Sequence, residues 1–323
     1  MFPLVSRKKN ERIVVDSFML SFKPVEELDR NQYRAHLKKC AFTTSSCEYA
    51  YANLFAWSDL YHTEWAEDEN ALYLRMHFEN ETHYLCPITP KERLKGSCES
   101  LAATERAKGK THIRFSCLPE DYEKLLSAFW GDGLVTHDRG HADYLYETPR
   151  LVTFPGKSLH AKKNHLNRFF ALYGDSFSFH PMTGSTEEIA CCLAFNKEWY
   201  ALNSGEGDEE LSEERKAVEK MLNRFSSLAL CGGMLYVGER LCGYTLASDN
   251  YDGAETLCVH VEKGLYDISG VYPALCSEFL KHCGSAYALI NREDDLNDEG
   301  LRRSKESYQP VRLEEKYACV YAL

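Results

Sequence analysis

The chain has 323 residues, of which 38 are Lys or Arg and 49 are Asp or Glu, giving a formal net charge of −11. With 44% apolar and 27% charged residues, the composition excludes a mainly disordered chain and a protein that coats nucleic acid over its whole surface. The length predicts about two domains. We expect them at 1–150 and 151–323.

The sequence gives little indication of a membrane span, a signal peptide or disulfide bonds. No apolar run approaches the roughly 18 residues that a membrane span needs. The first residues, MFPLVSRKKNERIVVDSF, lack the continuous apolar region of a signal peptide. We therefore expect a cytoplasmic protein without an integral membrane segment. The 13 cysteines are odd in number and form no CxxC motif, so we expect reduced, mostly buried thiols and predict no metal site.

Helices and strands alternate in the first half. Helices are predicted at 24–40, 92–108 and 119–130, and Ser45 and Glu48 have capping-box spacing ahead of an aromatic run. Short alternating segments predict strands at 71–77, 82–86, 112–118, 133–137 and 142–147.

The second half has clearer boundaries. Helices are predicted at 159–174, from Ser185 through Trp199, at 211–225, 268–283 and 298–308. Strands are predicted at 177–181, as a hairpin within 227–248, and at 255–263, 285–291 and 312–323. From residue 227 the order is hairpin, strand, helix, strand, helix, strand. Few folds place a helical crossover after an antiparallel hairpin, and the acyltransferase fold of the GNAT superfamily is one of them.

The first half shows a weaker version of the same alternation, which indicates tandem copies. The predicted fold class is therefore α/β with α+β mixed sheets, arranged as two tandem GNAT-like domains. We expect the second sheet to splay between the strands at 255–263 and 285–291, and the candidate active site to lie in that opening.

A basic segment introduces the second half. Residues 150–174 contain no acidic side chain. At about 100° per residue, a polar helical arc lies opposite Leu166 and Phe169. Lysine, arginine and asparagine side chains suit an anionic partner such as a nucleic-acid backbone. The candidates are Lys157, Lys163, Asn164, Asn167 and Arg168. The alternative is a solvated surface helix, balanced by an acidic loop at 206–214.

Two further groups are candidates for chemistry. On a regular strand, His260 and Glu262 share one face and could supply a general base, although a satisfied structural pair is an equal alternative. Arg292, Asp294 and Lys305 follow the strand at 285–291, where open α/β sheets place ligands. A solvated salt-bridge cluster is the alternative there.

A coenzyme A site is weakly indicated. An acetyl-coenzyme A enzyme of this fold should carry Q/R-x-x-G-x-G/A before the helix at 268–283. The chain has KGLYDISGVYPA, in which Asp267 replaces the cation and Tyr272 the second small residue. An acidic side chain there repels pyrophosphate.

Several segments together resemble a known family. They are CEYAYANLFAWSDLYHTEWAE, GKSLHAKKNHLNRF, HVEKG, INREDDLNDEGLRRSKESYQP and a later EKY. The sequence resembles uncharacterised bacterial proteins related to the catalytic C-terminal domain of phosphatidylglycerol lysyltransferase, which has two GNAT-like domains in tandem. The resemblance implies transfer of an aminoacyl group from its ester on tRNA to a hydroxyl or amine. Gly300, Leu301, Lys305, Tyr308 and Pro310 match the family pattern.

The sequence and the resemblance give one hypothesis with two rivals. The predicted catalytic residues are His260, Glu262, Arg292, Asp294 and Lys305. Tyr308 joins the basic-segment candidates as a substrate or tRNA contact, and no cofactor is expected. The first rival is an N-acyltransferase of the GNAT type that uses acyl-coenzyme A. The second is a non-catalytic binding module on the same fold.

Overall fold

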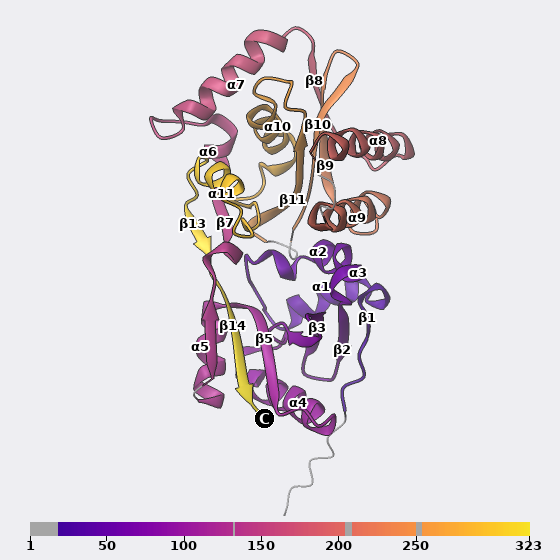
Figure 1. Cartoon of the computed structure of the whole chain (residues 1–323), viewed down its shortest axis with the longest axis vertical. Helices are drawn as coiled ribbons and strands as arrows, with labels where there is room; N and C mark the ends of the chain where they lie inside the picture. Colours follow the sequence, from indigo (N-terminus) through magenta and orange to yellow (C-terminus); the bar gives the residue numbers. More distant parts are fainter. Residues whose placement is uncertain (1–18, 132, 204–208, 250–253) are drawn as a thin grey trace, which may run out of the picture.

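The computed structural model describes residues 19–131, 133–203, 209–249 and 254–323, which form two seven-stranded sheets. The sheets follow one another along the long axis of the molecule, and the C-terminus lies in the lower one (Figure 1). Two predictions fall outside the described residues: the lack of a signal peptide in 1–18 and the start of the acidic loop, up to residue 208.

The lower sheet comes mainly from the first half of the chain. In spatial order its strands are β1 (Lys23–Pro24), β2 (Glu64–Glu67), β3 (Leu72–Phe78), β4 (Glu81–Tyr84), β5 (His112–Pro119), β14 (Lys316–Ala322) and β6 (Leu134–His137). Its helices are α1 (Arg30–Lys39), α2 (Tyr51–Ala56), α3 (Ser58–Tyr61), α4 (Leu94–Ala107) and α5 (Glu120–Trp130). The helix predicted from residue 24 begins only at Arg30, because the Asp29 side chain caps it by accepting two backbone N–H bonds.

The upper sheet comes mainly from the second half. In spatial order its strands are β8 (Phe177–Pro181), β9 (Cys231–Val237), β10 (Arg240–Asp249), β11 (Thr256–Gly264), β12 (Leu289–Asn291), β7 (Asp143–Glu147) and β13 (Arg312–Glu314). Its helices are α6 (Thr148–Thr153), α7 (His160–Tyr173), α8 (Thr186–Asn203), α9 (Glu209–Asn223), α10 (Val271–Phe279) and α11 (Glu299–Glu306). In Figure 1, α8 and α9 lie on one side of this sheet and α10 on the other.

The predicted capping box before α8 is confirmed. The backbone N–H of Glu188 donates to Ser185 Oγ at 3.3 Å, and the Ser185 N–H donates to Glu188 Oε2 at 3.0 Å. Both donors would otherwise be unsatisfied at the start of the helix. Local sequence therefore sets this helix boundary.

The two sheets repeat one strand order and exchange one strand. β3, β4 and β5 occupy the places of β10, β11 and β12, and each series ends in a parallel pair flanked by an antiparallel neighbour. That neighbour comes from the other half of the chain: β14 pairs with β5, and β7 pairs with β12. With a boundary at residue 150, β7 belongs to the first half of the chain but completes the upper sheet, and β14 belongs to the second half but completes the lower sheet.

The exchange changes the predicted C-terminal strand. The segment expected as one strand at 312–323 divides into β13, in the upper sheet, and β14, in the lower sheet. Lys316 begins β14 and is buried, with Nζ 2.6 Å from Asp143 Oδ1 on β7. This ion pair links the two exchanged strands.

Both halves bury large apolar clusters. One cluster is rich in aromatic rings, including Tyr33, Tyr49, Tyr84 and Phe115, and continues from the lower half into α8, α9 and β10. The other packs α10 against the strands of the upper sheet. The 13 cysteines are free thiols, most of them buried, as predicted. Within the described residues, no helix is both long and apolar enough to cross a membrane.

Candidate functional site

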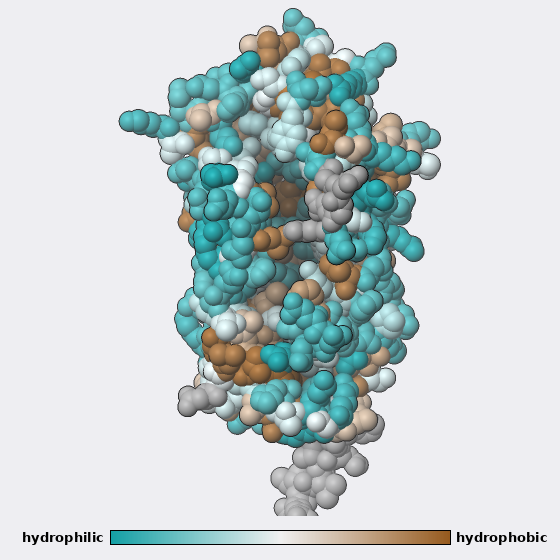
Figure 2. All heavy atoms as spheres, in the orientation of Figure 1, coloured by the Kyte–Doolittle hydropathy of each residue, from teal (hydrophilic) through white to brown (hydrophobic). Residues whose placement is uncertain are grey.

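The upper sheet opens at its parallel pair. β12 pairs with β11 over Thr256–Cys258 alone, and residues 259–264 of β11 continue past the end of β12. The β12-facing edge of these residues therefore has no pairing with β12. Figure 2 shows the surface hollowed near the middle of the molecule, between the α11 side and the α9 side. The splay predicted between these two strands is present.

A bulge on β11 decides which side chains face the opening. Leu246 on β10 pairs with Val261, but the next residue, Ala247, pairs with Val259, so His260 is an extra residue on β11. His260 bonds Ser248 and Glu293, whereas Glu262 bonds Arg292. The expectation that His260 and Glu262 share one face is wrong, because the bulge breaks the two-residue alternation between them.

Arg292 is the centre of a buried charged cluster at the splay. Its Nη2 donates to Glu262 Oε1 at 2.7 Å, and its guanidinium lies 4.4 Å from the centre of the Tyr308 ring. Its Nη1 is buried and has no hydrogen-bond partner among the described residues. Burial raises the pKa of Glu262. One donor of a buried cation therefore remains available to a ligand.

Lys162 completes this cluster from α7. Its Nζ lies 3.8 Å from the centre of the Tyr308 ring. Burial, aided by the nearby Arg292 charge, lowers the pKa of Lys162 to about 8. Sequence reasoning missed its role, although a signal existed. Lys162, Leu166 and Phe169 have the spacing of one helical face, so this lysine lies on the apolar side of α7.

Lys305 and Tyr308 support the cluster from the α11 region. Lys305 Nζ donates to the backbone carbonyl of Arg292 at 2.7 Å and to that of Asp294, and burial lowers the pKa of Lys305. Tyr308 is only 2% exposed. It is therefore a packing surface for the two cations and not an exposed contact for tRNA. Tyr146 on β7 adds a further hydrogen bond, from its hydroxyl to the Lys305 carbonyl.

The carboxylate of Asp294 points away from the Arg292 cluster. Its Oδ2 lies 3.5 Å from His141 Nδ1, a contact that raises the pKa of His141. Asp294 thus offers the cluster its backbone carbonyl, while its carboxylate faces the loop before β7. Of the predicted catalytic residues, the structure brings together Glu262, Arg292 and Lys305.

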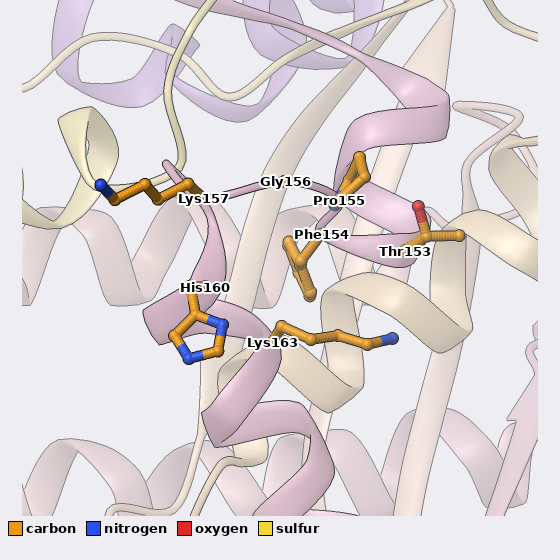
Figure 3. Close-up of a pocket in the computed structure, with 7 residues that line it drawn as sticks. All are labelled: Thr153, Phe154, Pro155, Gly156, Lys157, His160 and Lys163. Atoms are coloured by element: carbon orange, nitrogen blue, oxygen red, sulfur yellow. The ribbon is translucent and has the colours of Figure 1, made fainter.

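A pocket of about 600 Å³ lies beside the cluster, at the turn from α6 to α7. It is lined by Thr153, Phe154, Pro155, Gly156, Lys157, His160 and Lys163. In Figure 3, Lys163 extends beneath the Phe154 ring, and Lys157 points away from it. Phe154 lies between the pocket and the Arg292 cluster, because its ring centre is 5.9 Å from the ring centre of Tyr308.

The remaining basic-segment candidates lie on the exposed face of α7. Asn164, Asn167 and Arg168 are exposed, and Leu166 and Phe169 are buried on the opposite side. The predicted amphipathic arc of α7 is therefore confirmed. Lys157 and Lys163 line the pocket at the start of α7, and Lys162, on the buried side of the same helix, belongs to the Arg292 cluster.

The segment expected to bind a coenzyme A pyrophosphate is occupied by protein. Asp267 is paired with Arg240, whose Nη1 donates to its carboxylate at 2.8 Å. Gly270 precedes α10 with φ +79°, and a Cβ there would lie 2.3 Å from the His165 carbonyl oxygen of α7. The start of α10 is therefore covered by α7, with a carbonyl oxygen where a phosphate would need donors.

Comparisons with known proteins agree with this architecture. The family model described as phosphatidylglycerol lysyltransferase, C-terminal, matches residues 41–320. A crystal structure of a conserved protein of unknown function from Bacteroides thetaiotaomicron is 31% identical, with a TM-score of 0.86 over 94% of this chain and 100% of that one. The structure of L-PGS from Bacillus licheniformis is 16% identical, with a TM-score of 0.63 over 91% of each chain.

A curated relative matches a shorter region. An uncharacterized protein of Mycoplasmoides gallisepticum is 27% identical over 177 residues, which are 54% of this chain and 54% of that protein. The chain thus spans about half the length of this relative. From the family model and the shared fold, the chain belongs to the phosphatidylglycerol lysyltransferase C-terminal domain family, and its two mixed sheets repeat one strand order.

Proposed function

We propose that this protein is an aminoacyltransferase that moves an aminoacyl group from tRNA to an acceptor hydroxyl or amine. Membership of the lysyltransferase family supports a transferase of acyl groups. The observation that carries the proposal is a guanidinium and an amine held together in the splay. Lys162 and Arg292 both lie within 4.4 Å of the Tyr308 ring centre, and Glu262 bonds Arg292.

The Arg292 guanidinium suits a carbonyl that becomes an oxyanion. When an acceptor attacks an ester carbonyl, negative charge develops on the carbonyl oxygen, and preorganised donors lower that barrier. Arg292 Nη1 and the free backbone edge of β11 beyond Cys258 are such donors. Glu262 and the Lys305 bond to the Arg292 carbonyl hold the guanidinium in position.

Lys162 is the general base of the proposal. With a pKa of about 8, its amine is neutral in a large fraction of molecules near pH 8. It takes the proton from the acceptor as the acceptor oxygen or nitrogen bonds to the carbonyl carbon. The tetrahedral intermediate then collapses, the bond to the ribose oxygen of tRNA breaks, and Lys162 returns its proton to that oxygen.

Three cations of the basic segment, two exposed and one half-buried, bind tRNA in this scheme. Lys157, Lys163 and Arg168 form a positive surface that leads to the pocket and the cluster. Lysine and arginine neutralise backbone phosphates, and Asn164 and Asn167 can donate to phosphate or sugar oxygens. The acyl-coenzyme A alternative is disfavoured because α7 covers the start of α10, where the pyrophosphate would bind.

A transfer assay tests the chemistry. The purified chain is incubated with a pool of tRNAs carrying radiolabelled amino acids and with phospholipid vesicles, polyamines and peptides as acceptors. We expect label to leave tRNA and appear in one acceptor class, and Lys162→Met to slow this by about 100-fold or more. The exposed Lys197 of α8 supplies the control, Lys197→Met, which should transfer at the wild-type rate.

Two results contradict the proposal. Release of label no faster than spontaneous hydrolysis with every aminoacyl-tRNA would favour the binding module. A thermal stabilisation by acetyl-coenzyme A, without one by aminoacyl-tRNA, would favour the coenzyme A enzyme.

A charge-reversal pair tests the tRNA surface separately. Lys163→Glu with Arg168→Glu should weaken tRNA binding and reduce the slope of log affinity against log salt by about two. The matched control, Lys197→Glu with Arg224→Glu, changes net charge equally at exposed sites outside α7. Equal losses in both double variants would show that net charge and not the α7 surface determines binding.

A further inference from the structure

A second polar cluster lies on the other face of β11, between the two domains. Cys258, His260 and Glu293 bring one sulfur, one nitrogen and one carboxylate oxygen within 4.8 Å of one another. His260 Nδ1 is 2.9 Å from Glu293 Oε1, and Cys258 Sγ is 3.8 Å from the same oxygen. The Cys258 residue and the His260 side chain are both 0% exposed.

Two backbone irregularities build this cluster. The bulge on β11 presents His260 beside Cys258, on the face away from Glu262. Glu293 has φ +57°, a conformation that non-glycine residues rarely adopt, and it turns the carboxylate back toward β11. Strained backbone of this kind persists where the surrounding structure determines it, and it concentrates at functional sites.

The spacing fits a tetrahedral zinc ion. With bonds of about 2.3 Å to sulfur and about 2.0 Å to nitrogen and oxygen, tetrahedral ligands lie about 3.3 Å apart for nitrogen and oxygen and about 3.5 Å for sulfur and oxygen. The observed distances, 2.9 Å and 3.8 Å, differ from these by a few tenths of an ångström. A small rearrangement of two side chains would accommodate the ion.

The surrounding groups match those that support metal ligands. Ser248 Oγ lies 2.8 Å from His260 Nε2, so the second ring nitrogen has the partner that fixes the ring orientation. Asn53 Nδ2 of α2 donates to Glu293 Oε1 at 3.1 Å. Asn53 is 9% exposed, and its Oδ1 is buried without a hydrogen-bond partner among the described residues. An unsatisfied buried acceptor at this position indicates an incomplete polar site.

We propose that Cys258, His260 and Glu293 bind one zinc ion at the junction of the two domains. A thiolate, an imidazole and a carboxylate are the ligands that zinc prefers, and they exclude magnesium and calcium, which bind oxygen. The thiolate and the carboxylate neutralise the two charges of the ion. On binding, zinc displaces two protons to solvent, the one on the Cys258 thiol and the one between His260 and Glu293. The fourth position is left for water or for Asn53 Oδ1 after rotation of the amide.

Metal analysis of the full chain tests the proposal. The tag-free protein is loaded with zinc, dialysed against metal-free buffer and analysed by inductively coupled plasma mass spectrometry. We expect one zinc per chain, and a near-ultraviolet thiolate-to-cobalt charge-transfer band after loading with Co²⁺. Cys258→Ser should abolish both signals, and Ser248→Ala should weaken zinc affinity by about 10- to 100-fold.

The control is Cys242→Ser, which alters a buried free thiol on the neighbouring strand β10 and should keep both signals. Circular dichroism checks that each variant is folded. Wild-type protein without zinc and without the cobalt band would overturn the proposal, as would equal zinc content in Cys258→Ser. Metal-free protein in which a fluorophosphonate labels Ser248 would overturn it in favour of a serine nucleophile activated by His260.

Discussion

The two parallel strand pairs, β4–β5 and β11–β12, occupy the same place in their sheets and carry different chemistry. In the upper sheet the last paired residue of β12 is followed by Arg292 and by Glu293 at φ +57°. In the lower sheet the last paired residue of β5 is followed by Ser116 and by Cys117 at φ +54°. The backbone conformation is therefore repeated in the two sheets, but the ion pair between Arg292 and Glu262 has no counterpart at Ser116.

The surroundings of the two pairs differ accordingly. Ser116 Oγ bonds His83 Nδ1 at 2.8 Å, and the chain after β4 returns to β3 through paired backbone bonds between Leu72 and Ile88. At the lower pair, the rings of Tyr84 and Phe115 pack together with their centres 6.2 Å apart, whereas the upper opening holds Arg292 and Glu262. This difference teaches that the fold supplies an opening and that the side chains at its edge decide whether it can host a reaction.

The largest effect should come from breaking the upper ion pair. Arg292→Met leaves Glu262 buried without its partner, which should lower the free energy of unfolding by about 3–5 kcal/mol. Ser116→Ala at the corresponding lower position removes one partly exposed hydrogen bond and should cost about 1 kcal/mol. Denaturation in urea measures both. Equal losses of unfolding free energy would contradict the view that the two strand pairs differ in their buried charge.

An intermediate effect should follow from displacing α7. Gly270→Ala places a methyl group against the His165 carbonyl, whereas Gly109→Ala, at a similar φ of +77°, meets nothing within 4 Å. Both variants have the same backbone strain, so the difference isolates the contact between α7 and α10. We expect Gly270→Ala to cost about 1–3 kcal/mol more than Gly109→Ala. Thermal unfolding gives the two values, and a difference near zero would show that α7 does not press on α10.

A pH-dependent effect should come from the titration of Lys162. Its folded pKa of about 8 lies below the ordinary value of about 10.4. The unfolded chain therefore binds more protons between these two values, and stability should rise with pH across that window. Pulsed acetylation read by mass spectrometry should give a midpoint near pH 8 for Lys162. Arg292→Met should move that midpoint upward, because the neighbouring positive charge is lost; an unchanged midpoint would leave burial as the whole cause.

Much of the fold could be predicted from local sequence. The amphipathic arc of α7, the capping box before α8 and the order from hairpin to last helix are all properties of short segments, and the structure has them. Arg292 and Lys305 were found because charged residues that follow a predicted strand meet at the edge of a sheet. Glu262 was predicted from a shared strand face with His260, which the bulge on β11 breaks. Lys162 was missed because a lysine on an apolar helical face gives no sign of a functional role until its neighbours, Arg292 and Tyr308, are known.

The sequence by itself determined the helices, most strands, the doubled α/β plan and the family, because each depends on residue patterns within a segment or on a signature along the chain. Tertiary structure alone decided the exchange of β7 and β14, the bulge that separates His260 from Glu262, and the joining of Lys162 to Arg292 over Tyr308. These features depend on strand register and on contacts between residues far apart in the sequence. Periodicity records which face a residue prefers, but not which neighbour it meets.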